Sequence, residues 1–488
     1  MVKRSLLALS IAAAGGAKTL LTQDLHLRLE TPLASYSRPG TPFTARVFGS
    51  FERDALPVLP AGTLIRGIVR RAHSIGLGLR LERSGLTLQF ESCQLPGGET
   101  VACDVQLLAV DNARETVHPN NRIRGALAAS HPASRMSGLW YRPGTDLLLR
   151  PASGLAGAGG MLASRFAPGP AGAAIFVVSR LIFFRMPDPE IELPAGTDLI
   201  ARVGTADRLA GAPAPLAPVP AAEFPDGFPE WLANVPGETT RTDGALAADT
   251  INMAFLGSES ELASAFAAAG WHGADPLTAR TFARTYSAFA GMRTYSRAPV
   301  SMLHHEGRPP DLVFQKSFNT LSRRHHIRLW QRELPGLGVV WLGAATHDVA
   351  IIFDWNRLNL THRIDTHTDR ERSKVVNDLS AMGCVDGALA IQRISELRRN
   401  PQSEQVVSDG AIWAGRLREC RASDPAGPLG LSKPQRSRAA LTLRRAVLET
   451  RQYLTRANPY HLAYQSVRRP ISGPKGTGKP ETYAMAFK

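Results

Sequence analysis

Apolar and polar residues alternate along most of residues 19–204. Residues 26–30, 44–48 and 86–90 each place an apolar side chain at every second position, and clusters of proline and glycine separate such segments. A period of two is typical of a strand with one face on the core and the other in solvent. Short strands joined by regular turns predict an all-β barrel or sandwich for residues 19–204.

Two turns in this region share the sequence Leu-Pro-Ala-Gly-Thr, at residues 59–63 and 193–197. Each precedes an apolar segment, residues 64–69 and 199–203. A turn built on proline and glycine would deliver the chain into a barrel strand. The phrase resembles turns in the β-barrel domains of envelope-associated secretion channel components, and this resemblance implies a barrel-like module of the cell envelope.

The composition changes after about residue 150. Residues 151–172 are rich in glycine and alanine and predict a loop, while the mostly apolar residues 175–184 predict a buried strand, or a strand plus a helical turn. Residues 205–245 predict a stiff linker, because proline recurs among small residues there. We expect aromatic residues to dock the end of this linker on a neighbouring surface: Phe224, Phe228 and Trp231.

Residues 246–410 mix helical and strand patterns, which predicts a separate α/β domain. Ser258 and Glu261 form a capping box before an apolar helical stripe that Gly270 ends, and Asp275 with Pro276 predicts the start of a second helix. Three strands and a helix are expected after these, at residues 323–330, 339–343, 361–365 and 369–382.

A series of uncommon pairs in this domain carries a family resemblance. They are Asn252, Leu256 to Glu259, Glu261 with Leu262, Ala269 to Trp271, Ala274 to Thr278, Asp311 with Leu312, Phe314 to Lys316, Arg324 to His326 with Arg328 and Trp330, Trp341 to Ala345, and His362 with Ile364 and Asp365. Over about residues 250–410 the chain resembles the LssY C-terminal domain family. In that family the domain is often attached to membrane segments or lipid-phosphatase-like domains, and some members lie near secretion genes. No phosphatase motif is present here, so the resemblance does not imply a phosphatase.

The polar block of this domain predicts an anion-binding cluster. Basic and aromatic residues gather on adjacent predicted strands, and guanidinium groups bind phosphate or carboxylate through two parallel hydrogen bonds. The expected binding residues are Lys316, Arg324, His325, His326, Arg328 and Trp330.

Two other interpretations of the same block stay open. His326, Asp348, His362 and Asp365 would suit a divalent metal if they converge. The chain would then be a metal-dependent or acid/base hydrolase of a phosphoester-like substrate, with His326, His362 and Asp365 as catalytic candidates. The third interpretation is a buried structural network, in which Arg328 pairs with Asp365 or Glu371. We expect no cofactor unless the metal is bound.

The four cysteines do not have the spacing of a metal site. Cys93 and Cys103 flank a turn near Gly98, so a hairpin there would place them opposite each other and allow a disulfide in an oxidising compartment. Two half-buried thiols are the alternative. Cys384 and Cys420 are expected to be isolated.

The N-terminus has the order of a secretory signal peptide. Lys3 and Arg4 precede the apolar residues 6–14, and small residues follow, so residues 1–18 predict an export signal and a periplasmic or cell-envelope location. A buried helix or a misplaced start codon is the alternative. An envelope protein or a peripheral membrane component is the expected partner, and an anionic small molecule a further one.

The formal charge of +15 lies largely in residues 401–488, which carry 15 Lys and Arg against six Asp and Glu. Only eight of the 57 basic residues are lysine, a bias that indicates a GC-rich genome, so nucleic acid is not the expected partner. Residues 411–488 predict a basic tail with an amphipathic helix at 435–456, packed on the second domain. Residues 473–479 have most of the spacing of a phosphate-binding loop, but Pro480 stands where that motif requires Ser or Thr. The motif is therefore rejected.

The chain is thus expected to be multidomain, with an N-terminal barrel or sandwich, a C-terminal mixed α/β domain and a helical basic tail. The expected function is that of an exported, secretion-associated cell-envelope protein that acts by binding or assembly.

Overall fold

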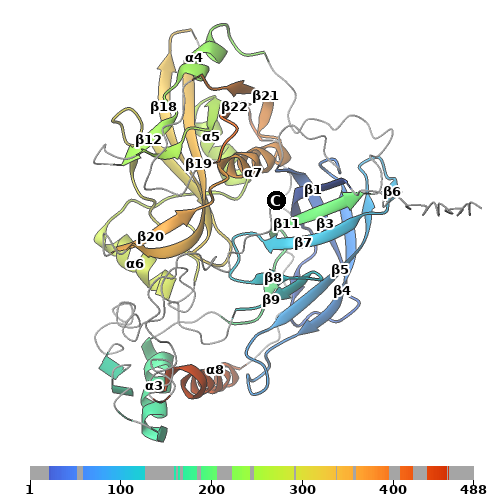
Figure 1. Cartoon of the computed structure of the whole chain (residues 1–488), viewed down its shortest axis with the longest axis vertical. Helices are drawn as coiled ribbons and strands as arrows, with labels where there is room; N and C mark the ends of the chain where they lie inside the picture. Colours follow the sequence, from blue (N-terminus) through green and yellow to red (C-terminus); the bar gives the residue numbers. More distant parts are fainter. Residues whose placement is uncertain are drawn as a thin grey trace, which may run out of the picture.

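The computed structural model describes most of the chain, and its two large sheets stand side by side (Figure 1). The described residues are 21–51, 59–126, 159–160, 163–164, 167, 169–183, 188–205, 223–241, 247–290, 293–336, 338–354, 359–394, 407–420, 437–458 and 460. Among them, no helix is both long and apolar enough to cross a membrane. The predicted export signal and residues 473–479 lie outside the described residues.

The N-terminal unit is all-β, as predicted. Its main sheet has the order β7-β11-β1-β3-β4-β5-β9-β8, with β6 paired to β5 and every pairing antiparallel. A second sheet contains only β2 (Leu33–Ala34) and β10 (Glu192–Leu193). The strands of the main sheet are β1 (Leu21–Leu29), β3 (Pro42–Ser50), β4 (Leu64–His73), β5 (Gly85–Gln94), β6 (Thr100–Val101), β7 (Asp104–Val110), β8 (Thr116–His118), β9 (Arg122–Arg124) and β11 (Asp198–Thr205).

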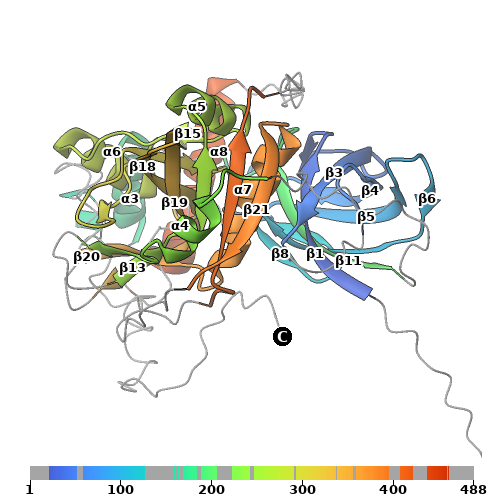
Figure 2. The same cartoon turned by 90° about the horizontal axis from the view of Figure 1, so that it is seen from above.

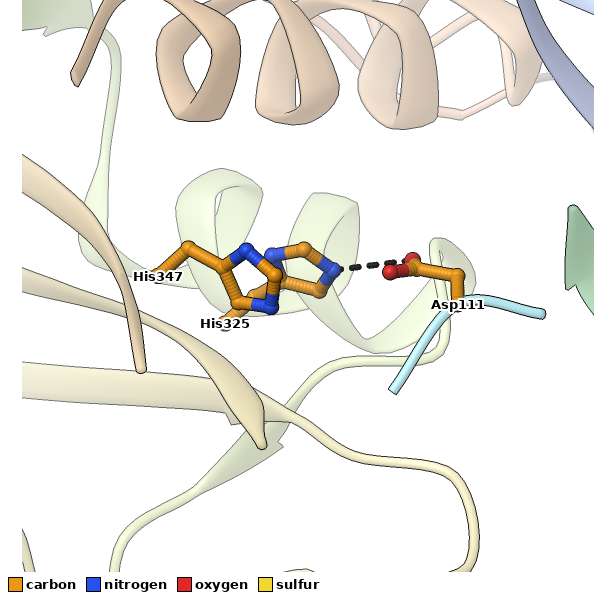
Figure 3. Close-up of side chains that lie close together, drawn as sticks. All are labelled: Asp111, His325 and His347. Carbon is orange, nitrogen blue, oxygen red and sulfur yellow. Dashed lines mark hydrogen bonds and ion pairs between the residues drawn. The ribbon is translucent and has the colours of Figure 1, made fainter. Parts of the chain in front are cut away.

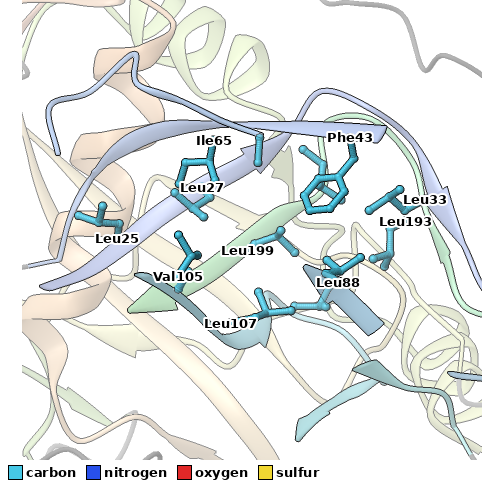
Figure 4. Packing of buried hydrophobic residues seen from close by; sticks show 14 of the residues in the cluster. Leu25, Leu27, Leu33, Phe43, Ile65, Leu88, Val105, Leu107, Leu193 and Leu199 are labelled. Atoms are coloured by element: carbon cyan, nitrogen blue, oxygen red, sulfur yellow. The ribbon is translucent and has the colours of Figure 1, made fainter. Parts of the chain in front are cut away.

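The sheet curls around one apolar core into a nearly closed barrel (Figure 4). The Asn121 side chain helps close it, because its Oδ1 accepts from Leu107 N–H on β7 while its Nδ2 donates to Val105 O on the same strand. The alternating apolar positions of the three segments are buried, except for the half-buried Phe90. They are Leu27, Leu29, Ala45, Val47, Leu86 and Leu88.

The second unit is built on an eight-stranded sheet with the order β15-β17-β18-β19-β14-β22-β21, and β20 pairs with β19. Only β14 and β22 are parallel. The strands are β14 (Met253–Leu256), β15 (His272–Gly273), β17 (Leu312–Lys316), β18 (Arg324–Leu334), β19 (Gly338–Asp354), β20 (Asn359–Ile364), β21 (Val385–Gln392) and β22 (Ala411–Leu417).

Helices cover both faces of this sheet (Figure 2). α5 (Glu259–Ala268) and α7 (Thr368–Ala381) pack on one face with Ile327, while α4 (Phe228–Asn234) packs on the other with Trp330. α6 (Ala279–Ala290) lies on a smaller apolar cluster with Ile351. A separate three-stranded sheet lies in the same unit. It contains β12 (Glu238–Arg241), β13 (Ala247–Thr250) and β16 (Leu303–His304).

The predicted helix caps are mixed in outcome. Ser258 and Glu261 form the capping box of α5, and Gly270 beyond its end has a φ of 80°, which glycine adopts without strain. Asp275 does not start the second helix. Thr278 Oγ1 accepts from Thr281 N–H at the start of α6 instead, and the Asp275 carboxylate accepts from Tyr295 and Arg297.

The apolar stretch expected to be a strand forms a helix over its described residues 175–183. In α3 (Gly169–Phe183) the buried residues Gly172, Phe176, Ser179 and Arg180 recur at three to four positions. That helical period, with Ile182 exposed, cannot be satisfied by alternating strand geometry. The apolar content alone did not separate these alternatives.

Two predictions for the C-terminal region are wrong. Ala411–Leu417 is not part of a tail, because β22 lies inside the second sheet between β14 and β21. The basic helix α8 (Arg438–Gln452), which continues into the π-helical turn η3 (Tyr453–Ala457), packs on α3 and the N-terminal unit rather than on the second domain. Buried ion pairs hold it there: Arg180 with Glu449, and Arg444 with Glu190.

Candidate functional site

The loop after β7 connects the barrel to the second domain. The sequence Val110 to Glu115 ends a strand in a polar turn, and Asn112 holds the left-handed conformation (φ 50°) that asparagine tolerates. Asn112 Nδ2 donates to Lys316 O, and the Arg114 N–H donates to Asn319 Oδ1 at 2.7 Å. The loop is therefore docked on β17 and the segment that follows it.

His325 lies at the centre of this contact, between the carboxylates of Asp111 and Glu371. Figure 3 shows its ring facing Asp111. Its Nε2 is 2.8 Å from Asp111 Oδ2 of the barrel loop, and its Nδ1 is 2.6 Å from Glu371 Oε2 of α7. Burial alone would lower the pKa of His325, but Asp111 and Glu371 outweigh it and raise that pKa to about 10. The ring is thus a buried imidazolium that bridges the two units.

His347 stacks on His325 with ring centroids 4.3 Å apart. Its Nε2 lies 3.0 Å from Asn112 Oδ1, so both histidines contact the same loop. Burial and the neighbouring His325 lower the pKa of His347 to about 3. His347 is therefore neutral where His325 is charged, which removes the repulsion that two stacked imidazolium rings would have.

A second ionic cluster lies at the same interface. Asp198 of β11 and Asp378 of α7 are each within 3.2 Å of three cationic groups, belonging to Arg28, Lys316 and Lys374. Burial would raise the pKa of Asp198, but these cations hold it well below its usual range. The Lys316 ammonium expected to bind an anion thus already contacts two carboxylates of the protein.

The opposite face of β18 carries Arg324, His326 and Arg328. Arg324 Nε donates to Asp348 Oδ2 at 2.9 Å, and Arg328 pairs with Asp249, not with Asp365 or Glu371. Both guanidinium groups also donate to backbone carbonyls, those of Pro299 and Ser301. An anion bound here would have to displace Asp348 or Asp249.

His326, Asp348 and His362 come together on this face. His326 Nδ1 is 3.7 Å and His362 Nε2 is 4.0 Å from Asp348 Oδ2. The register explains it: Arg324 pairs with Asp348 and His326 with Thr346, while Ile364, two residues from His362, pairs with Asp348. Burial lowers the pKa of both histidines, that of His326 well below its ordinary value.

The remaining candidates lie apart from these groups. The Asp365 carboxylate accepts from the His367 N–H, and among the described residues no hydrogen bond or ion pair joins it to His326, Asp348 or His362. Trp330 is buried in the apolar layer under α4 and donates to Arg308 O, which gives it a packing role.

The cysteines are all bonded. Cys93 and Cys103 form a disulfide, although the register of the hairpin pairs Cys93 with Val101 rather than with Cys103. Cys384 and Cys420, expected to be isolated, form a second disulfide. Residue 420 follows β22, whose pairing with β21 brings the chain back beside Cys384.

Several residues of the interface were not identified from the sequence: His26, Asp111, Asp198, His347, Lys374 and Asp378. For Asp111 the sequence offers one indication, the polar run after residue 110. A run of Asp, Asn, Arg and Glu at the end of a strand indicates a polar loop that can form hydrogen bonds and ion pairs. The others lie on three strands and one helix that are far apart in the chain, namely β1, β11, β19 and α7, and no spacing in the sequence relates them.

Comparison with protein-family models finds a match for the second unit of the chain. A comparison with curated proteins finds no match. Residues 232–412 match the family model described as LssY C-terminus, a span that runs from α4 to β22 and contains His325, Asp348, His362 and Glu371. This second unit of the chain is an LssY C-terminal domain.

Proposed function

We propose that the chain is an exported cell-envelope protein that acts by binding and assembly, with the barrel and the LssY-type domain locked into one body. The observation that carries this proposal is the position of the polar cluster. Arg324, His325, His326 and Arg328 are buried in the fold or at the domain interface, and Lys316 is half-buried there. All of these except His326 form close pairs with carboxylates.

Buried, paired charges are suited to fixing two units in one register. Removing one partner of a buried pair costs several kcal/mol, about 3–5, so the docked arrangement is strongly preferred over arrangements that leave one charge alone. A rigid two-domain body presents a fixed outer surface, which suits an envelope protein or a peripheral membrane component as partner. The resemblance of the barrel turns to secretion channel components supports an assembly role.

Export is supported by the cysteines. Both disulfides, Cys93–Cys103 and Cys384–Cys420, are of a kind that persists in oxidising compartments and is rare in the cytosol. The order of residues 1–18 supports the same location.

The experiment that tests this proposal measures both where the chain is located and whether it is part of a larger complex. The untagged chain would be expressed in its native host, and the periplasmic, membrane and cytosolic fractions probed after alkylation of free thiols. We expect a processed, fully disulfide-bonded chain in the envelope fractions, migrating in a complex larger than the monomer. The Asp111→Asn variant should leave export intact but reduce the complex. The control Asp104→Asn, at an exposed position at the start of β7, should leave both intact. A cytosolic, reduced chain that migrates alone would overturn the proposal.

A further inference from the structure

His326 and His362 each have an unsatisfied nitrogen atom near the Asp348 carboxylate. His326 Nδ1 and His362 Nε2 are buried and have no hydrogen-bond partner among the described residues. Both lie closest to Asp348 Oδ2, at 3.7 and 4.0 Å, which is beyond hydrogen-bond distance. Buried polar atoms without partners are rare in native folds and call for an explanation.

The tautomer of His326 sharpens the point. Thr346 Oγ1 donates to Asp249 Oδ2 at 3.3 Å, so the same oxygen is free to accept from His326 Nε2 at 2.7 Å. With its proton on Nε2, His326 presents the Nδ1 lone pair to the Asp348 carboxylate. Two acceptors that face each other in a buried position repel unless a cation lies between them.

We infer that His326 Nδ1, Asp348 Oδ2 and His362 Nε2 form a binding site for a divalent transition cation of the zinc type. Two imidazole nitrogens and one carboxylate oxygen are a ligand set that Zn²⁺ and similar ions take in proteins. Tetrahedral ligands at about 2.0–2.1 Å from a metal lie about 3.3 Å from one another. The two nitrogens lie 3.7 and 4.0 Å from Asp348 Oδ2 but farther from each other, so binding of an ion would draw the two histidine rings together.

The surroundings have the features of a metal site. Thr346 with Asp249 fixes the His326 ring from behind, and Arg324 Nε holds Asp348, as outer partners do around metal ligands. The β19 ladder is irregular between Asp348 and Ala350, at the point where β20 presents His362. The His362 side chain is 31% exposed, which leaves a route for an ion and a position for a water molecule or an anion as fourth ligand.

The two other histidine–carboxylate groups of the described residues are less suited to a cation. In Asp111, His325 and His347 both nitrogens of His325 already have partners at 2.6 and 2.8 Å. In His26, Asp198 and Asp378 the His26 nitrogens also lack hydrogen-bond partners in the described part of the chain, but both carboxylates already contact Arg28, Lys316 and Lys374, whereas Asp348 is held by Arg324. Neither group needs a metal to satisfy its charges.

The test is metal loading of the full chain. Tag-free protein would be stripped with a chelator, dialysed against excess Zn²⁺ and then against buffer, and its metal content measured. Excess is used because the charge of Arg324 beside the site weakens cation binding. We expect about one zinc ion per chain for the natural protein. His326→Gln and His362→Gln should each lose it.

Three matched variants identify the site. His272→Gln removes an exposed histidine, Asp365→Asn removes a carboxylate outside the trio, and His347→Gln removes a histidine of the domain interface. All three should keep the ion. Loss of zinc in His347→Gln with retention in His362→Gln would overturn the assignment, as would an unchanged zinc content in both His326→Gln and His362→Gln.

A spectroscopic measurement separates binding from folding. Co²⁺ in the stripped protein should give the intense visible absorption of tetrahedral coordination, lost in His362→Gln while the thermal unfolding of the metal-free variant stays that of the metal-free natural protein. Thr346→Val should weaken Co²⁺ affinity about 10- to 100-fold with the spectrum retained at saturation. A chain that takes up no Co²⁺ or Zn²⁺ overturns this inference and leaves the assembly proposal untouched.

Discussion

Asp111 Oδ2 in the loop after β7 lies 2.8 Å from His325 Nε2 on β18. The two residues are 214 positions apart in the chain, and their contact joins the two units. On the other side of the ring, Glu371 of α7 accepts from Nδ1. The imidazolium of His325 on β18 thus links the barrel loop to α7 of the LssY-type domain. The contact explains why the polar block of this domain is buried rather than open.

The first prediction concerns pH. The pKa of His325 is raised to about 10 in the folded chain, above its value of about 6.5 when unfolded, so its contribution to stability is complete below about pH 6.5 and is lost as pH rises to about 10. Besides Asp111 and Glu371, His347 and Lys374 lie close to the ring or to Asp111. The free energy of unfolding of the natural protein should therefore approach that of His325→Gln as the pH increases. Denaturant titrations across this range measure both, and a gap that widens with pH would contradict the assignment.

At acidic pH the stability of the protein should change in the opposite direction, falling as the pH falls. Burial would raise the pKa of Asp198, yet Arg28, Lys316 and Lys374 lower it well below the ordinary value, so its contribution is present above about pH 4 and is lost as pH falls further. Lys374→Met removes one of these cations, and the variant should unfold at a higher pH on acidification than the natural protein. Circular dichroism during acid titration follows this, with Lys488→Met in the basic tail as control. Equal acid midpoints for all three proteins would count against the cluster.

The disulfides should contribute unequally to stability. Loop-closure entropy predicts about 4 kcal/mol for Cys384–Cys420, which are separated by 36 residues, and about 3 kcal/mol for Cys93–Cys103, separated by 10. The double variants Cys384→Ser/Cys420→Ser and Cys93→Ser/Cys103→Ser, compared by urea unfolding, should rank in that order. Mass spectrometry after alkylation would contradict both bonds if it found four free thiols.

The basic helix α8 should be released by loss of one arginine. Arg444 is buried and pairs with Asp188 and Glu190, so Arg444→Ala leaves Glu190 without this cation. We expect the amide protons of α8 to exchange at least about tenfold faster, the effect of about 1.4 kcal/mol of local stability. Leu443→Ala, at a side chain that is 57% exposed, is the control and should change little. Protection that is equal in both variants would show that the ion pairs do not hold the helix.

Much of the fold could be predicted from local patterns. The alternating residues of β1, β3 and β5 identified the barrel strands, and Ser258 with Glu261 identified the start of α5, because period and capping are read from adjacent residues. Residues 175–184 were assigned to the wrong element because a short apolar run suits a strand and a buried helix equally. The place of β22 depends on pairing with β14, about 160 residues earlier, and no local signal encodes that.

The candidate site shows the same limit. Arg324 to Arg328 were singled out correctly as a polar block on one strand, and their alternation assigned His325 and His326 to opposite faces. Their partners could not be found, because Asp111 lies in the other domain and Asp249 in a separate small sheet. Asp365 was grouped with His362 from proximity in sequence, whereas the structure turns its carboxylate to the backbone of His367.

A double-mutant cycle between Asp111 and His325 tests the central claim most directly, that this pair locks the two units together. The free energy of unfolding would be measured near neutral pH for the natural protein, Asp111→Asn, His325→Gln and the double variant. The account predicts that each single change costs several kcal/mol, about 3–5, and that the pair is coupled by about 1–3 kcal/mol, so the double variant loses less than the sum. Two effects that add to within about 0.5 kcal/mol would contradict it.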